Sequence, residues 1–363
     1  MKFAAPRAVA VLLSLSLTAC GDTAVGPGTR MDRGVIANEV TDVFLPNIDS
    51  LATRGARLNV DLQALAAAPT DAALATAQAA WRLTRQSYEF GEAFSFGPIE
   101  TDGIDPAVDT WPVDIAGIEQ LTQTPALLTT PYIASLPTTL KGFHGVELVL
   151  FGSPGTPTTV ANLTPGQLAY LVAAGQDLSN ELSDLEIAWT PSSGNFAGTV
   201  LTAGQSGSAY SSETAAMQDI VTQMATQPAQ FIYKLQEPVA TDSSIYEESR
   251  FSDNTLADIQ NNLAGTAALY YGGLTPTTNK GLGSIVRAND PTLDATVRQQ
   301  IIEAANAINA ITPSFDVALH TNPALLTAAA QASLNLQTTM INLVGPLLGV
   351  GHAGPLGGQP DND

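Results

Sequence analysis

Two residues with the chemistry of a metal site lie three positions apart in an apolar stretch. His144 and Glu147 belong to residues 141–152, which read KGFHGVELVLFG. Because residues three apart lie on one face of a helix, the imidazole and the carboxylate can converge on one point. Leu148 and Phe151 continue that face into the core, where buried polar groups need partners. The pair predicts either a metal site or a structural histidine–carboxylate hydrogen bond.

Other acidic residues are candidates to complete a ligand set, because two protein ligands do not hold an ion tightly. Glu89 and Glu92 lie on one predicted helix; Glu92 lacks a basic residue one turn earlier, whereas Glu89 has Arg85 as an alternative partner. Asp105 precedes a proline and is favoured as a helix cap, and Asp109 follows in the same loop. The predicted metal ligands are therefore His144, Glu147, Glu92, Asp109, Glu89 and Asp105.

Three polar residues precede the helix expected at 255–271. Arg250, Ser252 and Asn254 are predicted either to line a pocket, where they would bind an anion or orient the metal ligands, or to cap that helix through Ser252 or Asn254. Imidazole and carboxylate ligands suit iron and zinc. We therefore expect iron or zinc as the bound ion.

The histidine motif is one of several segments that, in this order, resemble the imelysin family. Residues 142–147 resemble the family's Gly-x-His-x-x-Glu signature. Further similar positions are Trp81-Arg82, Tyr88-Glu89, Glu92, residues 96–99, 104–106, 109–112 and 248–255, Asp258 and Asn262. The resemblance implies an all-α fold of two packed helical bundles and a place in the cell envelope. It also implies either a role in iron uptake or the insulin-cleaving metallopeptidase activity for which the family was first described.

The first twenty residues have the pattern of a lipoprotein signal. Lys2 and Arg7 precede an apolar run at 8–17, which is too short to span a bilayer as a stable helix. Leu17-Thr18-Ala19-Cys20 then reads as a lipobox with cleavage before the only cysteine. We predict a signal peptide at 1–19, a lipid on Cys20, and a flexible tether at 20–31. The protein would then be anchored to a bacterial membrane, facing the periplasm or the cell surface.

Charge argues against nucleic acid as a partner. The chain carries 34 acidic against 14 basic residues, a formal net charge of −20. Such a surface repels phosphate backbones and anionic lipid headgroups. Contact with the membrane is therefore expected through the lipid anchor only.

Apolar residues recur with a helical period through most of the chain, and no sustained alternation predicts a sheet. The cluster Ser153-Pro154-Gly155-Thr156-Pro157 is the clearest interruption. We predict an N-terminal bundle at 32–153, a C-terminal bundle at 158–348 and a disordered tail at 349–363. The expected helices are 71–96, 115–123, 136–151, one starting at Pro165, 212–235, 255–271, 291–311 and 323–347.

These observations lead to three functional hypotheses. The favoured one is an envelope lipoprotein that binds iron or zinc for uptake or sensing, together with an iron-transport protein as partner. The second is a metallopeptidase in which Glu89 or Glu92 acts as general base. The third is a module that binds a peptide or small ligand between the bundles without a metal.

Overall fold

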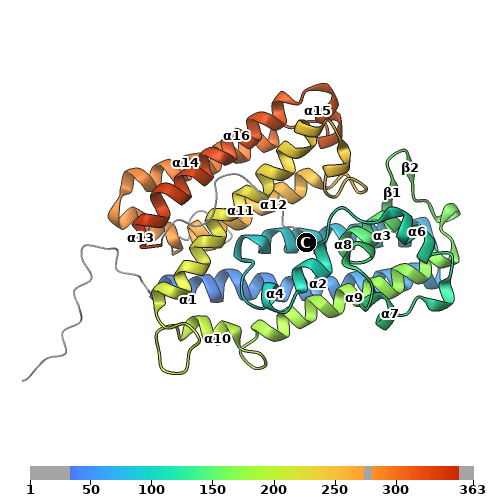
Figure 1. The fold of residues 1–363 in the computed structure, drawn as a ribbon, viewed down its shortest axis with the longest axis horizontal. Helices are drawn as coiled ribbons and strands as arrows, with labels where there is room; N and C mark the ends of the chain where they lie inside the picture. Colours follow the sequence, from blue (N-terminus) through green and yellow to red (C-terminus); the bar gives the residue numbers. More distant parts are fainter. Residues whose placement is uncertain (1–32, 274–279, 351–363) are drawn as a thin grey trace, which may run out of the picture.

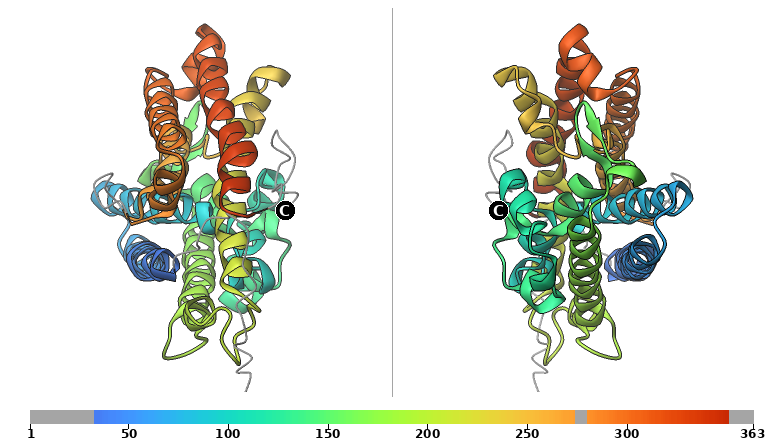
Figure 2. Two further views of the ribbon diagram at one scale, coloured as in Figure 1. Left: turned by 90° about the vertical axis from the view of Figure 1, so that its left-hand side faces the viewer. Right: turned by 90° about the vertical axis from the view of Figure 1, so that its right-hand side faces the viewer.

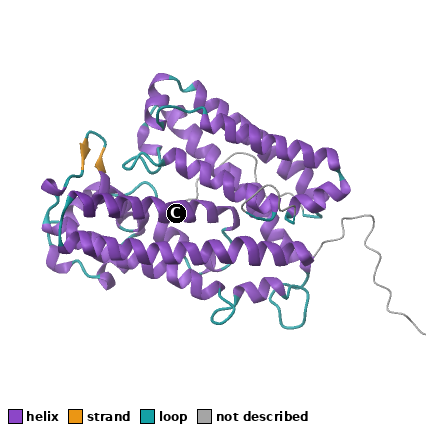
Figure 3. Ribbon diagram, turned by 180° about the vertical axis from the view of Figure 1, so that it is seen from behind, coloured by secondary structure: helices purple, strands orange, loops and turns teal. Residues whose placement is uncertain are grey.

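The fold is built from helices joined by short turns. It is taken from a computed structural model that describes residues 33–273 and 280–350. One small antiparallel hairpin pairs Gly152 with Pro157 and Ser153 with Thr156, and it stands out among the helices in Figure 3. The predicted all-α class is confirmed. With 3-10 and π segments marked η, the elements are α1 (Arg33–Asn38), η1 (Glu39–Phe44), α2 (Leu45–Ala67), α3 (Asp71–Gly91), η2 (Glu92–Phe94), α4 (Pro98–Thr101), α5 (Ile104–Asp109), α6 (Ile115–Leu121), η3 (Pro125–Leu127), α7 (Thr130–Ala134), η4 (Thr138–Leu140), α8 (Gly142–Phe151), β1 (Gly152–Ser153), β2 (Thr156–Pro157), η5 (Val160–Asn162), α9 (Pro165–Trp189), α10 (Phe196–Leu201), α11 (Glu213–Thr241), η6 (Ser244–Tyr246), α12 (Thr255–Tyr271), α13 (Leu282–Asn289), α14 (Pro291–Asn309), α15 (Phe315–Thr321), α16 (Ala324–Thr339), η7 (Met340–Val344) and α17 (Gly345–Leu347).

Helix starts follow the capping residues in the sequence. The Thr70 hydroxyl accepts a hydrogen bond from the Ala73 N–H and begins α3. Thr164 begins α9 with a reciprocal capping box to Gln167, followed by a proline at the first helical position. The Ser212 hydroxyl begins α11 by accepting a hydrogen bond from the Ala215 N–H. Side chains that satisfy the free N–H groups of the first turn thus define the long helices.

Other helix boundaries differ from those predicted from the sequence. The helix expected to reach residue 96 ends at Gly91 and continues as one 3-10 turn, η2. The motif helix α8 begins at Gly142 rather than at residue 136, because η4 and an extended Lys141 precede it. The loop expected at 98–112 contains the short helices α4 and α5.

The helices form two groups stacked on each other (Figure 1). The lower group contains α2, α3, α8 and α9, and the upper group contains α12, α14 and α16. The 29-residue α11 runs obliquely from the lower group, near α10, into the upper group, where it packs on α16. α12 packs against α3 and so joins the groups. The side views in Figure 2 show the red and orange helices of the upper group above the blue and green helices of the lower group.

The division into bundles does not fall at residues 154–157. α9, which we expected in the C-terminal bundle, packs lengthwise on α2 and also on α8. Buried apolar residues from Val35 to Val350 form one continuous core. The hairpin interrupts the lower group rather than ending it, because its turn returns the chain to the same core. Turn residues predict where a helix stops but not where the next one packs.

The terminal predictions fall mostly beyond the described residues. The signal peptide, the Cys20 lipidation site and the tether lie there, as does the predicted tail from residue 351 onward. Gly349 and Val350, the first tail residues, belong to the fold: the Val350 side chain is buried and its N–H donates to Gly345 O. In the part of the chain that is described, each helix is too short or too polar to cross a bilayer.

Candidate metal centre

Close backbone packing fixes the helix that carries His144 and Glu147. Gly142 has φ +71°, and a Cβ there would lie 2.4 Å from the carbonyl oxygen of Val108 in α5. A Cβ on Gly145 would lie 2.3 Å from the Tyr170 hydroxyl of α9. Glycine is required at both positions because another group occupies the space of a side chain. The α5 backbone and the Tyr170 side chain therefore come close to α8 on either side of His144.

Three carboxylates surround the His144 imidazole. Its Nδ1 lies 2.9 Å from Glu147 Oε2. Its Nε2 lies 3.2 Å from Asp109 Oδ1 and 3.6 Å from Glu248 Oε1, and it makes no hydrogen bond of acceptable geometry. Trp111 packs edge-on against the ring, with 4.8 Å between ring centroids. One imidazole nitrogen is therefore held by its neighbour, and the other faces two carboxylate oxygens.

Glu147 orients the histidine. Its Oε1 accepts hydrogen bonds from the Ser252 backbone N–H at 2.9 Å and the Ser252 hydroxyl at 2.7 Å. Its Oε2 faces His144 Nδ1, so both oxygens have partners. A carboxylate that holds the second nitrogen of a histidine fixes the orientation of the ring and makes the other nitrogen a better ligand.

Arg85 occupies the centre of the acidic cluster. Its guanidinium forms ion pairs with Asp109, Glu89 and Glu248, and Nε lies 3.5 Å from Asp258 Oδ2. Its side chain is wholly buried. Burial lowers the pKa of Arg85, but the four carboxylates outweigh this effect and raise it well above the ordinary value. Arg85 is therefore a permanent buried cation.

Lys234 of α11 supplies a second buried cation. Its Nζ lies 3.0 Å from Glu89 Oε2, 3.1 Å from Glu248 Oε2 and 3.6 Å from Glu92 Oε2. The Asn262 amide donates to Glu89 Oε2 at 2.6 Å and also to Glu92. Lys234 thus separates Glu89 and Glu92 from the histidine and ties them to the far side of Glu248.

Negative charge exceeds positive charge in this buried region. Six carboxylates, those of Glu89, Glu92, Asp109, Glu147, Glu248 and Asp258, meet two permanent cations, Arg85 and Lys234. Buried charges of one sign are costly unless a proton or a cation compensates them.

The pKa values of the cluster reflect this excess. Burial, and then repulsion from Glu89, raise the pKa of Asp258 to about 8. Burial likewise raises the pKa of Glu92. For Glu248, burial acts upward, but Lys234, Arg85 and His144 outweigh it and lower the pKa. For His144, burial and Arg85 act downward, yet the neighbouring carboxylates of Asp109, Glu147 and Glu248 raise the pKa overall.

Asp109, His144 and Glu248 are the side chains able to hold a metal ion. Within the described ranges, each offers one ligand atom, and these atoms lie within 4.8 Å of one another. The partnerless Nε2 of His144 fits this role, because a buried nitrogen of this kind requires a proton donor, a proton or a metal. One imidazole nitrogen and two carboxylate oxygens form a set that suits iron or zinc.

Comparison with known proteins identifies the family of this chain. The family model Peptidase M75, described as imelysin, matches residues 44–341. The chain belongs to the imelysin family. The match contains every residue of the cluster from Arg85 to Asn262, and it confirms the resemblance inferred from the sequence.

Two of the similar proteins have iron regulation in their names or descriptions. The chain is 30% identical over 298 residues to "Iron-regulated protein A" of Synechococcus elongatus, which covers 81% of this chain and 79% of that protein. A crystal structure described as that of an iron-regulated protein A precursor from Parabacteroides distasonis superposes with a TM-score of 0.79 and 25% identity, over 89% of this chain and 97% of that one. An imelysin-like protein from Psychrobacter arcticum, 16% identical, shares the fold with a TM-score of 0.72, over 90% of this chain and 99% of that one.

The imelysin fold separates the residues that the sequence grouped as ligands. Asp109 and His144 lie together. Glu147 lies behind the imidazole, where Ser252 holds it. Glu89 and Glu92 face Lys234 instead, because their shared helix face points at α11.

The remaining predicted residues serve other contacts. Asp105 does not cap α5, whose N-cap is Gly103; it accepts a hydrogen bond from Tyr88. Arg250 lies over the rings of Trp111 and Phe251, next to His144. Asn254 is the N-cap position of α12, but its side chain donates to Asp258 Oδ1 rather than capping the helix.

Sequence reasoning missed Glu248, Lys234 and the burial of Arg85. Glu248 lay within the imelysin-like segment at 248–255, so the family pattern contained a signal for it. A basic residue in the apolar stretch of α11, Lys234, was a weaker signal. Neither signal states that these side chains meet residues more than a hundred positions earlier.

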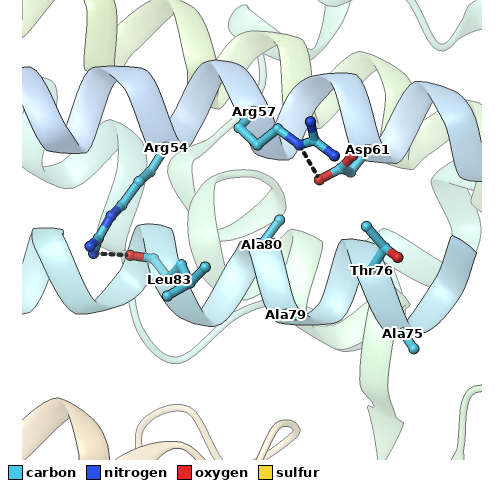
Figure 4. A pocket seen from close by; sticks show the side chains of 8 residues that line it. All are labelled: Arg54, Arg57, Asp61, Ala75, Thr76, Ala79, Ala80 and Leu83. Carbon is cyan, nitrogen blue, oxygen red and sulfur yellow. Dashed lines mark hydrogen bonds and ion pairs between the residues drawn. The ribbon is translucent and has the colours of Figure 1, made fainter. Parts of the chain in front are cut away.

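A separate groove lies on the outside of the imelysin fold, between α2 and α3 (Figure 4). Its volume is about 420 Å³. Arg57 Nε pairs with Asp61 Oδ2 at 2.8 Å, and an Arg54 Nη donates to Leu83 O at 2.8 Å. Its lining consists of Arg54, Arg57, Asp61, Ala75, Thr76, Ala79, Ala80 and Leu83. The groove contains none of the candidate ligands and is not part of the metal centre.

Proposed function

We propose that this imelysin-family protein binds a transition-metal ion, iron in the first place and zinc in the second, through Asp109, His144 and Glu248. One observation carries the proposal. Three donor atoms from distant parts of the chain converge, and His144 Nε2 among them has no hydrogen-bond partner. A group assembled from α5, α8 and the segment before α12 requires the whole fold, which is typical of a binding site.

The charge of the buried cluster and the name of a relative support iron as the bound ion. The excess of buried carboxylates favours binding of a cation, and the mixed nitrogen and oxygen set suits iron. The relative from Synechococcus elongatus has iron regulation in its name. We infer a role in iron uptake or sensing, with delivery to or from an iron-transport protein.

The metallopeptidase alternative receives less support. Hydrolysis requires a substrate carbonyl and a water at the ion. The side chains of His144 and Glu147 are fully buried, and both Glu147 oxygens already accept hydrogen bonds or face the imidazole. Burial of this degree favours holding an ion over admitting a peptide.

Calorimetric titration with ferrous, ferric and zinc ions tests the proposal. The full chain without an affinity tag is expected to bind at least one of them at a single site. Glu248→Gln removes one anionic ligand and is expected to weaken binding at least about tenfold, because even the loss of a partner of a ligand costs ~10–100-fold.

The neighbouring Glu247 offers a matched control. It is buried and hydrogen-bonded to Thr255, and burial raises its pKa to about 8, so it is mostly neutral at pH 7. Glu247→Gln therefore changes little charge and is expected to leave binding unchanged. Equal binding by the unchanged protein and Glu248→Gln, or no binding by either, would rule out this site.

We also propose that the protein is a lipoprotein of the cell envelope, anchored through Cys20 and facing the periplasm or the cell surface. The lipobox at 17–20 supports this location. Cys20→Ser is expected to abolish labelling by radioactive palmitate and to move the protein from the membrane fraction to the soluble fraction. Thr18→Ser, which leaves the lipobox intact, is the control. Membrane retention of Cys20→Ser would contradict lipid anchoring.

A further inference from the structure

The two oxygens of Glu248 face different cations. Oε1 faces His144 Nε2 at 3.6 Å and pairs with Arg85. Oε2 lies 3.1 Å from Lys234 Nζ. Oε1 is therefore the Glu248 oxygen on the side of His144, where an ion would share it with Arg85, and Oε2 is engaged by an ammonium group.

Lys234 is held firmly in this position. Its side chain is 9% exposed, and Glu89 Oε2 binds the same ammonium at 3.0 Å. Asn262 in turn holds Glu89 Oε2 at 2.6 Å. Moving the ammonium away from Glu248 would break these contacts in a buried setting, where they are strong.

The other acidic neighbour is restricted in a similar way. Both oxygens of Glu147 have partners, Ser252 on one side and His144 Nδ1 on the other. The protein thus offers an incoming ion one nitrogen and one oxygen from each of two carboxylates. Bidentate binding by Glu248 would require displacing Lys234.

This restriction discriminates between classes of cation. Calcium takes six to eight oxygen ligands and commonly a bidentate carboxylate. Iron and zinc accept imidazole and need fewer ligands from the protein. We propose that Lys234 is a specificity-determining residue, which disfavours calcium at this site by keeping Oε2 of Glu248 from the ion. The inference rests on the proposed function, because it concerns the selectivity of the same site.

The test compares calcium and zinc affinities in a charge-balanced variant. Lys234→Met with Glu89→Gln removes the ammonium and one of its carboxylate partners, so the net charge of the cluster stays constant. We expect the ratio of calcium to zinc affinity, measured by calorimetry with each ion alone, to rise at least about tenfold. Lys234→Arg keeps a positive donor beside Glu248 and is expected to keep the original ratio. Lys280→Met, at an exposed position, controls for loss of a lysine elsewhere.

Circular dichroism establishes whether each variant is folded. If the double variant is unfolded, Lys234→Met alone, which removes the donor beside Glu248 and keeps Glu89, provides the same comparison and the same expected direction. An unchanged ratio in a folded variant, or calcium binding by the original protein as tight as zinc binding, would overturn the inference. Zinc binding with an unchanged ratio contradicts the inference alone, whereas the absence of zinc and iron binding by the original protein contradicts the proposed function as well.

Discussion

Replacing Arg85 by methionine is expected to lower the free energy of unfolding by about 3–5 kcal/mol. The guanidinium is wholly buried and pairs with Asp109, Glu89 and Glu248. Methionine approximates the unbranched stem of arginine but leaves these carboxylates without a counter-charge in a region of low dielectric. Urea unfolding followed by circular dichroism measures the loss.

Arg57→Met is the matched control, because Arg57 is 66% exposed and its ion-pair partner among the described residues is Asp61, four residues away. That pair lies in water, so its removal is expected to leave stability nearly unchanged. A loss of less than about 1 kcal/mol for Arg85→Met would show that protons already neutralise the cluster. Two of these carboxylates, Asp109 and Glu248, would also hold the proposed metal. Saturating zinc is therefore expected to restore part of the stability lost in Arg85→Met, and to change the stability of Arg57→Met no more than that of the original protein.

The position of Arg85 illustrates how much of the fold could be predicted from the sequence. The helix that carries it was predicted over 71–96, and a helix is present over Asp71–Gly91. Arg85 was also predicted as an alternative partner of Glu89, and the two side chains form an ion pair. Helical periodicity tells which residues share a face, while the packing of α12 on α3 decides that this face is buried.

The candidate site could be predicted from the sequence only in part, for the same reason. His144 and Glu147 are local neighbours, so their spacing in the sequence placed them together. Asp109 was one acid among several, and its approach to His144 depends on α5 packing against the Gly142 backbone. Glu248 reaches the imidazole only because the segment before α12 folds back over α8. Contacts between distant segments depend on how the helices pack, and no local pattern in the sequence predicts that packing.

Replacing His144 by alanine is expected to make metal binding undetectable by calorimetry. The imidazole supplies the one nitrogen ligand of the proposed set, and its Nε2 is the atom that faces both Asp109 and Glu248. Loss of a direct ligand should exceed the ~10–100-fold loss caused by removing the partner of a ligand. Glu147→Gln supplies that smaller effect, because an amide still contacts His144 Nδ1 but no longer as an anion.

His320→Ala is the matched histidine control. His320 is 51% exposed and its nearest ion-pair partner is Asp316, 3.5 Å away on the same helix. The His320→Ala variant is expected to bind zinc and iron as the original protein does. The ordering of the three variants is the decisive result: His144→Ala weakest, Glu147→Gln intermediate and His320→Ala unchanged. Should Glu147→Gln weaken binding more than His144→Ala, the ligand and the residue that orients it would have to exchange roles, and the ion would lie on the Ser252 side of the imidazole.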